Sequence, residues 1–396
     1  MLGQNDKNGL KENMRPENFS DRIVQHRLRR FFRVILILAL IAGIAGVFWV
    51  QQKQRTYTGY VTVHSSKREI SSSAKSVVLG NDILSYSKDG VNCCDTGGKT
   101  LWNETYEMQN PILAVCNSTA AIGDYNGGKI YVMNRDGAMG EITTNLPIRA
   151  LCVSDDGVVA AVLDDTDVTW IYLYNAKGAT LAYFKTTMSQ SGYPASISIS
   201  PNSRLVVVSY VQADTGKVKS GVAFYNFGDV GQNEVDNYMS GYDYADTVVP
   251  YVQFMNSEDA FAVADNRLMF FEGAQKPVSK AEKLLDKEVQ SVYFNSKYVA
   301  LVTYDSSGKN KYLLTVYDTG GNVKLQKGFD LEYKNLVLSN DNIYIYSDSQ
   351  CLIYNLYGVK KFSGTLNQTI SLLIPGSGIN RMDIVSQSAI TKVQLK

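Results

Sequence analysis

The stretch Leu173-Tyr174-Asn175-Ala176-Lys177-Gly178 represents a unit that recurs along this chain and decides its fold. In each unit an apolar or aromatic pair is followed by Asp, Asn or Glu and then by glycine. The pattern predicts a strand end, a polar side chain that hydrogen-bonds its own turn backbone, and a glycine at positive φ, so that the chain reverses into the next strand. The acidic or amide residues of the visible units stand at positions 95, 134, 175, 226, 272, 318 and 355.

The spacing of these turns predicts four-stranded blades. Successive units lie 37 to 51 residues apart, close to the roughly 40 to 50 residues of one propeller blade, including WD40-like blades. Two further apolar runs precede a turn, as at Ile148 to Val153 and Val158 to Leu163 ahead of Val168 to Tyr174. Each turn is therefore expected to join the third and fourth strands of a blade.

The remaining segments decide the number of blades. Beyond the last turn, Thr369 to Ile374, Arg381 to Val385 and Ile390 to Leu395 supply three strands without a fourth, and Tyr57 to His64 is an unpaired strand at the other end. If that strand completes the last blade, both termini close the ring and no open edge of the array remains. We predict an all-β, eight-bladed β-propeller, with seven blades as the alternative.

An apolar run precedes the propeller. Val34 to Val50 carries no charged side chain and would span roughly 25 Å as a helix, enough for a short transmembrane segment. Bulky Val47-Phe48-Trp49-Val50 stands where a signal-peptide cleavage site needs small residues, which favours an uncleaved signal anchor.

Charge asymmetry predicts the orientation of the chain. Residues 1–33 carry eight basic and four acidic side chains, a net charge of +4, so the positive-inside rule places them in the cytoplasm. We predict four parts: a largely disordered basic tail (1–33), one transmembrane helix (34–50), a short linker (51–55) and an extracytoplasmic propeller (56–396) closed by strand 57–64.

The composition after the apolar run argues against nucleic-acid binding. From residue 34 onward, 31 basic and 34 acidic side chains leave a net charge of −3, which offers no basic field to a phosphate backbone. The five cysteines are an odd number and include no CxxC pair. They are expected to be buried free thiols, with one structural disulfide as the alternative.

Side chains for catalysis or metal binding are sparse. His64 is the only histidine after the apolar run, so a Ser-His-Asp triad would have to use it and a site with several histidines is excluded. The acidic runs Asp155-Asp156 and Asp164-Asp165-Thr166-Asp167, and also Asp124, lack the EF-hand spacing and are expected to be solvated turns. We predict no catalytic residue, no metal site and no bound cofactor.

Tyrosines suggest where a partner binds. Tyr238, Tyr242, Tyr244 and Tyr251 form a dense patch, and tyrosine suits contact with sugars or peptides. The longest interval between turns, 51 residues, lies in the fourth blade and implies an extra loop at 211–221 or 231–246. Because loops on a rigid scaffold commonly carry binding sites, these four tyrosines are the predicted binding surface.

One turn resembles a known repeat. Asp95-Thr96-Gly97-Gly98-Lys99-Thr100-Leu101-Trp102 is similar to the repeat of quinoprotein-type (PQQ-like) propellers, and Asp318-Thr319-Gly320-Gly321 matches it in part. With its anchor, the chain resembles bacterial membrane-anchored PQQ-like propellers without assigned function. The enzymes of that superfamily use a tryptophan in most blades, calcium and a quinone, whereas only Trp102 and Trp170 follow the apolar run here.

These observations predict a single-pass membrane protein of the cell envelope. Its propeller is expected to act as a scaffold that binds a protein or a glycan, and not as an enzyme. The alternatives are a quinone-dependent or hydrolytic propeller enzyme and a transmembrane sensor.

Overall fold

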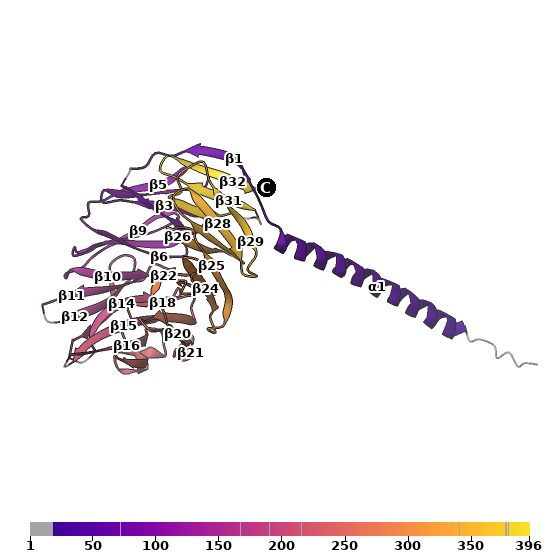
Figure 1. Cartoon of the computed structure of the whole chain (residues 1–396). Coiled ribbons are helices and arrows are strands. Elements are labelled where there is room, and N and C mark those ends of the chain that lie inside the picture. The colour runs from indigo at the N-terminus through magenta and orange to yellow at the C-terminus, as the bar shows by residue number, and fades with distance from the viewer. Residues whose placement is uncertain are drawn as a thin grey trace, which may run out of the picture. The chain divides into compact units, whose positions relative to one another are not determined.

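The structure is a computed structural model that describes residues 19–396 except 72, 167, 190, 215, 340, 377 and 379. The chain divides into two compact units, Met1–Arg55 and Thr56–Lys396. The first contains helix α1 (Phe19–Gln54), and the second contains all of the described strands (Figure 1).

Helix α1 is longer than the apolar run that predicted it. Residues 19–33, which we assigned to a largely disordered tail, and residues 51–54 of the expected linker are helical. The sequence between Pro16 and Gly43 holds no proline or glycine, and its Arg, Leu and Gln residues favour a helix. Residues 1–18 of the predicted tail lie outside the described residues. The part of α1 from Arg27 to Gln54 is long and apolar enough to cross a membrane, as both anchors and signal sequences are.

The first four blades are antiparallel four-stranded sheets in sequence order. Their strands are β2 (Lys75–Leu79), β3 (Asp82–Tyr86), β4 (Gly90–Cys94) and β5 (Thr100–Thr105) in blade 1; β6 (Pro111–Cys116), β7 (Thr119–Asp124), β8 (Lys129–Asn134) and β9 (Gly137–Thr143) in blade 2; β10 (Ile148–Val153), β11 (Val159–Asp164), β12 (Thr169–Tyr174) and β13 (Thr180–Thr186) in blade 3; and β14 (Tyr193–Ile199), β15 (Leu205–Asp214), β16 (Lys217–Asn226) and β17 (Tyr238–Ala245) in blade 4. Two short 3-10 helices, η1 (Gly231–Asn233) and η2 (Val235–Asn237), precede β17.

The next three blades repeat this order, and the last one combines both ends of the propeller. Their strands are β18 (Tyr251–Phe254), β19 (Asp259–Val263), β20 (Arg267–Glu272) and β21 (Val278–Leu284) in blade 5; β22 (Val289–Phe294), β23 (Tyr298–Tyr304), β24 (Tyr312–Asp318) and β25 (Val323–Phe329) in blade 6; β26 (Asn335–Ser339), β27 (Asn342–Tyr346), β28 (Gln350–Asn355) and β29 (Lys360–Thr365) in blade 7; and β30 (Leu372–Pro375), β31 (Arg381–Val385), β32 (Ala389–Leu395) and β1 (Tyr60–Lys67) in blade 8.

The ring closes where the two ends of the propeller meet. Strand β1 pairs antiparallel with β32, from Tyr60 opposite Leu395 to Lys67 opposite Ala389 (Figure 1). The prediction of eight blades is confirmed, with the closing strand three residues later than expected. Tyr57 lies ahead of that strand, where its ring is buried and its N–H donates to Lys361 O at 2.7 Å.

The core lies between blades. On β11, Val159 and Ala161 pack with residues of blade 2, and Ala160 and Val162 pack with residues of blade 4. Neighbouring side chains of a strand point to opposite faces, so a strand between two blades needs apolar residues throughout. All five cysteines are free thiols. Cys93 and Cys94 belong to different clusters, as their adjacent positions on one strand predict.

The recurring turn has the predicted geometry. Asn175 Oδ1 accepts hydrogen bonds from the N–H groups of Lys177 and Ala179 at 3.0 and 2.9 Å, and Gly178 has a φ of +86°. The side-chain oxygens of Asp95, Asp318 and Asn355 each accept two turn N–H groups in the same way. Each turn joins the third and fourth strands of its blade, as predicted.

Candidate functional site: the groove between blades 3 and 4

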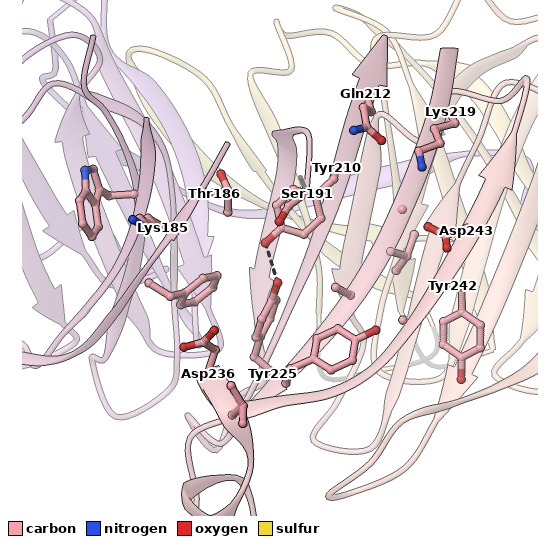
Figure 2. Close-up of a pocket in the computed structure, with 18 of the residues that line it drawn as sticks. Lys185, Thr186, Ser191, Tyr210, Gln212, Lys219, Tyr225, Asp236, Tyr242 and Asp243 are labelled. Atoms are coloured by element: carbon pink, nitrogen blue, oxygen red, sulfur yellow. Dashed lines mark hydrogen bonds between the residues drawn. The ribbon is translucent and has the colours of Figure 1, made fainter. Parts of the chain in front are cut away.

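An open cavity of about 830 Å³ lies between the outer strands of blades 3 and 4 (Figure 2). We call it the blade 3–4 groove and define it by Phe184, Tyr210, Gly221, Tyr225 and Gly241. Phe184 comes from β13, and the other four come from β15, β16 and β17. Its volume lies within the range of about 300–1,000 Å³ that is usual for ligand sites.

Small residues create this space. On β16 and β17 the positions beside the groove include Gly221, Ala223 and Gly241, with Ala223 opposite Gly241 in the sheet. The ring of Tyr238 packs across Gly241. A Cβ atom at Gly241 would lie 2.2 Å from the tyrosine hydroxyl, so this packing requires glycine. At Gly221, by contrast, a Cβ atom would meet its nearest neighbour, Asp243 Oδ1, at 3.6 Å, an ordinary van der Waals contact, so a small side chain fits there.

Two tyrosines form the buried floor of the groove. The hydroxyl oxygens of Tyr210 and Tyr225 lie 2.8 Å apart and share a hydrogen bond (Figure 2). Phe184 stacks on Tyr225 from the facing blade, with ring centroids 4.5 Å apart. Burial raises the pKa of Tyr210 well above its ordinary value and raises the pKa of Tyr225 to about 12. The floor therefore stays uncharged at neutral pH.

Four side chains that are charged at neutral pH also line the groove. They are two lysines and two aspartates: Lys185, Lys219, Asp236 and Asp243 (Figure 2). Within the described part of the chain none of the four makes an ion pair with another residue. They carry no net charge together, and their polar groups are available to a ligand.

An aromatic ladder lies on the face of blade 3 that packs toward blade 2, opposite to the face from which Phe184 meets blade 4. The ladder consists of Trp170, Tyr172 and Tyr174 on β12 and Tyr183 on β13. The rings of Tyr172 and Tyr183 stack at 5.2 Å with an angle of 16°, and Trp170 lies 5.9 Å from Tyr183. Trp170 and Tyr183 also line the groove, and the Tyr183 side chain is 60% exposed.

The structure separates the four tyrosines that the sequence grouped. Tyr238 lines the groove, is 47% exposed, and meets the ring of Tyr225 edge-on at 6.0 Å. Tyr242 touches the groove, yet its hydroxyl is bound to blade 5: it donates to Pro277 O at 3.3 Å and accepts from Ser279 N–H at 2.9 Å.

The other two tyrosines lie away from the groove. Tyr244 is only 6% exposed and packs in the core between blades 4 and 5, with Arg267 over its ring at 5.5 Å. Tyr251 is half-buried, and its hydroxyl donates to Gln253 Oε1 at 3.3 Å. Placing Tyr244 on a binding surface was therefore wrong, because its position on β17 faces blade 5.

A β-bulge explains why Tyr238 differs from Tyr242 and Tyr244. The three residues stand at even spacing, which in a regular strand puts them on one face. The register of β16 and β17 shifts between Phe224 and Tyr225, so Tyr238 lies opposite Tyr225 while Tyr242 lies opposite Val222. An extra residue in one strand reverses which face the following side chains occupy.

Sequence reasoning missed most of the groove. The extra length in blade 4 is not a loop at 211–221, because β15 and β16 are ten-residue strands that carry Gln212 and Lys219 to the groove. The second expected segment, 231–246, supplies η2 with Asp236. The signal that could have revealed the space is the pair Gly221 and Gly241, which we assigned to extra loops and which lie within strands β16 and β17.

The other candidate residues occupy structural positions. Asp164 forms an ion pair with Arg149 at 2.6 Å, and Asp156 accepts a hydrogen bond from Ser154 Oγ at 2.5 Å. His64 is exposed on β1. Asp167 lies outside the described residues. Among the residues that the structure describes, no group of three or more His, Cys, Asp or Glu could hold a metal ion.

Several solved structures resemble this chain at low sequence identity. AztD from Citrobacter koseri has a TM-score of 0.51 and 9% identity over 75% of this chain and 87% of that chain. BamB from Moraxella catarrhalis has a TM-score of 0.49 and 15% identity over 85% and 100% of the two chains. Sqt1 from Saccharomyces cerevisiae has a TM-score of 0.49 and 11% identity over 87% and 99%. At 9% identity, the likeness to AztD concerns the fold alone.

Comparison of sequences identifies the family but no characterised relative. No curated protein matches the chain. A profile of DUF5711, described as a family of unknown function, matches residues 53–395, which include every strand of the propeller. The chain therefore belongs to the DUF5711 family.

Proposed function

We propose that this protein is a membrane-anchored scaffold of the cell envelope whose extracytoplasmic propeller binds a protein or a glycan in the blade 3–4 groove. The observation that carries the proposal is the groove itself. It combines a rigid aromatic floor, the exposed ring of Tyr238, and four charged side chains that make no ion pair among the described residues. Concave sites with convergent polar groups are where ligands commonly bind.

Helix α1 and the charges around it support the proposed anchor. Its large apolar side chains, such as Leu36 and Ile44, are exposed to the surroundings, which suits a lipid environment. The net charge of +4 on residues 1–33 supports a cytoplasmic N-terminus and an extracytoplasmic propeller. Only Arg55 and Thr56 separate the end of α1 from Tyr57, whose N–H is bonded into the propeller, so an uncleaved anchor would hold the groove in the envelope.

Binding is favoured over catalysis by the chemistry of the groove. Its floor is a pair of tyrosines with raised pKa values, which are poor proton acceptors at neutral pH. The four ionisable side chains come from β13, η2, β16 and β17. Such an arrangement suits hydrogen bonding and charge contacts to a bound partner.

Site-specific photo-crosslinking in living cells tests the proposal. The photoreactive residue p-benzoylphenylalanine replaces Tyr238 in the full chain, and in a control it replaces the exposed Leu284 of β21 in blade 5. We expect a light-dependent adduct from position 238 that is absent from position 284. The same adducts from both positions, or none from position 238, would refute the groove as the binding site.

A protease test addresses the topology separately. Protease added to spheroplasts is expected to digest the propeller after Thr56 and to spare an epitope tag fused to the N-terminus. Digestion of the tag with protection of the propeller would reverse the proposed orientation.

A further inference from the structure

We infer that the blade 3–4 groove binds an extended basic segment of a partner protein, with a lysine or arginine side chain packed on the ring of Tyr238 near the carboxylates of Asp236 and Asp243. This inference rests on the proposed function and goes further, because it selects a protein over a glycan and gives the bound segment a charge.

The charges that face the groove are mostly negative. On β13, Phe184 packs toward blade 4, so the side chain of the neighbouring Lys185 points to the opposite face of blade 3. The other charged residues of the lining are Lys219, Asp236 and Asp243. The groove itself therefore receives one positive and two negative charges.

The lysine that faces the groove lies far from its aromatic floor. Lys219 precedes Tyr225 by six residues on β16, which separates them by about 20 Å along the strand. Asp243 stands opposite Gly221, two residues from Lys219, so these two opposite charges share one end of the groove. Asp236 lies beside the Tyr225 ring at the other end (Figure 2). Exposed charges are largely screened beyond about 8 Å in physiological salt, so Lys219 does not neutralise Asp236.

The wall beside Asp236 adds further negative charge. Residues 226–245, which include η1, η2 and β17, hold Asp229, Glu234, Asp236 and Asp243 but no lysine or arginine. The chain after the apolar run is nearly balanced, with 31 basic and 34 acidic side chains. This wall therefore concentrates negative charge that a basic partner would complement.

Tyr238 offers a ring on which such a cation can pack. Its side chain lines the groove and is 47% exposed. Burial raises the pKa of Tyr238, and the nearby charge of Asp243 adds to the rise. Burial likewise raises the pKa of Tyr225, and the charge of Asp236 adds to it. Both carboxylates thus lie close enough to the rings to act on one cation with them, because lysine and arginine are attracted to a tyrosine face within about 6 Å.

The shape of the groove suits an extended segment. From Lys219 to Tyr225 the groove follows β16, a length that about six residues of extended chain would cover. Gly221, Ala223 and Gly241 keep the facing wall low along this path. A neutral glycan would gain no charge attraction from the carboxylates, and an anionic glycan would be repelled by them.

Peptides of defined charge provide the test. The full chain in nanodiscs of zwitterionic lipid is titrated with octaarginine, with octaglutamate and with cellotetraose, and binding is measured by calorimetry. Empty nanodiscs correct for binding to the lipid. We expect saturable binding of octaarginine that weakens as the salt concentration rises, and no binding of octaglutamate or cellotetraose.

Matched variants locate the bound peptide. Asp236 has a φ of +54°, a conformation that asparagine also tolerates, so Asp236→Asn removes the charge and keeps the backbone. The control Asp136→Asn alters an exposed aspartate in the corresponding turn of blade 2. Tyr238→Ala removes the ring, whereas Tyr238→Phe keeps it. We expect at least about a fivefold loss of affinity for octaarginine in Asp236→Asn and Tyr238→Ala, and little change in Asp136→Asn and Tyr238→Phe.

The outcomes distinguish this inference from the proposed function. If octaarginine does not bind while position 238 still crosslinks to a protein, the charge of the bound segment is wrong and the scaffold function stands. If octaarginine does not bind and position 238 yields no adduct, both fail. Binding of cellotetraose or octaglutamate in place of octaarginine, or equal losses in Asp236→Asn and Asp136→Asn, would also overturn the inference.

Discussion

The hydroxyl oxygens of Tyr210 and Tyr225 lie 2.8 Å apart between β15 and β16, where both side chains are buried. Each hydroxyl is the partner of the other, so neither is left unsatisfied beneath the open space above it. This pair gives the groove a polar yet uncharged floor that is fixed by the sheet, and a ligand would meet a surface already arranged before it binds.

Removing one member of this pair should destabilise the propeller. Tyr210→Phe and Tyr225→Phe each leave the other buried hydroxyl without its hydrogen-bond partner, and each should lower the free energy of unfolding by about 1–3 kcal/mol. The double variant leaves no hydroxyl unsatisfied, so it should lose less stability than the sum of the two single variants. Urea unfolding of the three variants measures the coupling, and strictly additive losses would contradict the paired arrangement.

A serine bridge between inner strands should also support the ring. Ser198 Oγ on β14 accepts the Phe254 N–H of β18 at 3.0 Å, and both residues are buried. Ser198→Ala removes this acceptor from a buried N–H and should cost about 1–3 kcal/mol of stability. The control Ser296→Ala alters an exposed side chain and should change stability by less than about 0.5 kcal/mol. Equal losses of stability in Ser198→Ala and Ser296→Ala, measured by urea unfolding, would contradict a stabilising role of the Ser198 hydrogen bond.

Closure of the ring should depend on the residues ahead of β1. Tyr57 is buried among side chains of blades 7 and 8, so Tyr57→Ala should lower the free energy of unfolding by about 3–5 kcal/mol, as other large-to-small core changes do. Val63 on β1 is exposed, and Val63→Ala is the control with little expected effect. A melting temperature unchanged by Tyr57→Ala would show that this segment does not close the propeller.

The ionisation of Asp305 should make the stability of the propeller depend on pH in the acid range. The Ser307 N–H donates to Asp305 Oδ1 at 2.8 Å, and with the Asn310 donors it lowers the pKa of Asp305 to about 2. The pKa of an aspartate in an unfolded chain is about 3.9. The stabilisation by the ionised Asp305 is therefore fully present above about pH 4 and is lost as the pH falls through about 2. Asp305→Asn should therefore be less stable than the wild type at pH 7, with the difference shrinking toward pH 2. A difference in urea midpoints that stays constant over this range would argue against the assignment.

The architecture could be predicted because its determinants are local. Asn175 and its counterparts satisfy their own turns within four residues, so each turn is visible in the sequence, and the spacing of the turns then gives the blade. The closing strand was predictable because the last blade lacked a fourth strand. Its start was misplaced because the residues before Tyr60 are bonded into the propeller through single contacts such as Tyr57 N–H to Lys361 O, not through a strand ladder.

The candidate site depends on features that a sequence pattern does not record. The bulge between β16 and β17 decides that Tyr238 faces the groove, whereas Tyr244 is buried against blade 5. Tyr210 and Phe184 lie in different blades and meet at Tyr225 only in the folded ring. The aromatic ladder was likewise hidden, because Tyr183 lies beside Tyr172 only through the pairing of β12 with β13.

Filling the groove provides the most direct test of the central claim that this space is the binding site. Gly221 lines the groove, and a Cβ atom there would make only ordinary van der Waals contacts without backbone strain, so Gly221→Phe should block the groove while Gly221→Ala leaves most of it open. The measurement is the binding of solubilised envelope extract to each protein held in nanodiscs on a biosensor. We predict saturable binding to the wild type and Gly221→Ala, and at least about tenfold weaker binding, or about 1.4 kcal/mol, to Gly221→Phe. Equal binding to all three, with Gly221→Phe folded by circular dichroism, would contradict the account.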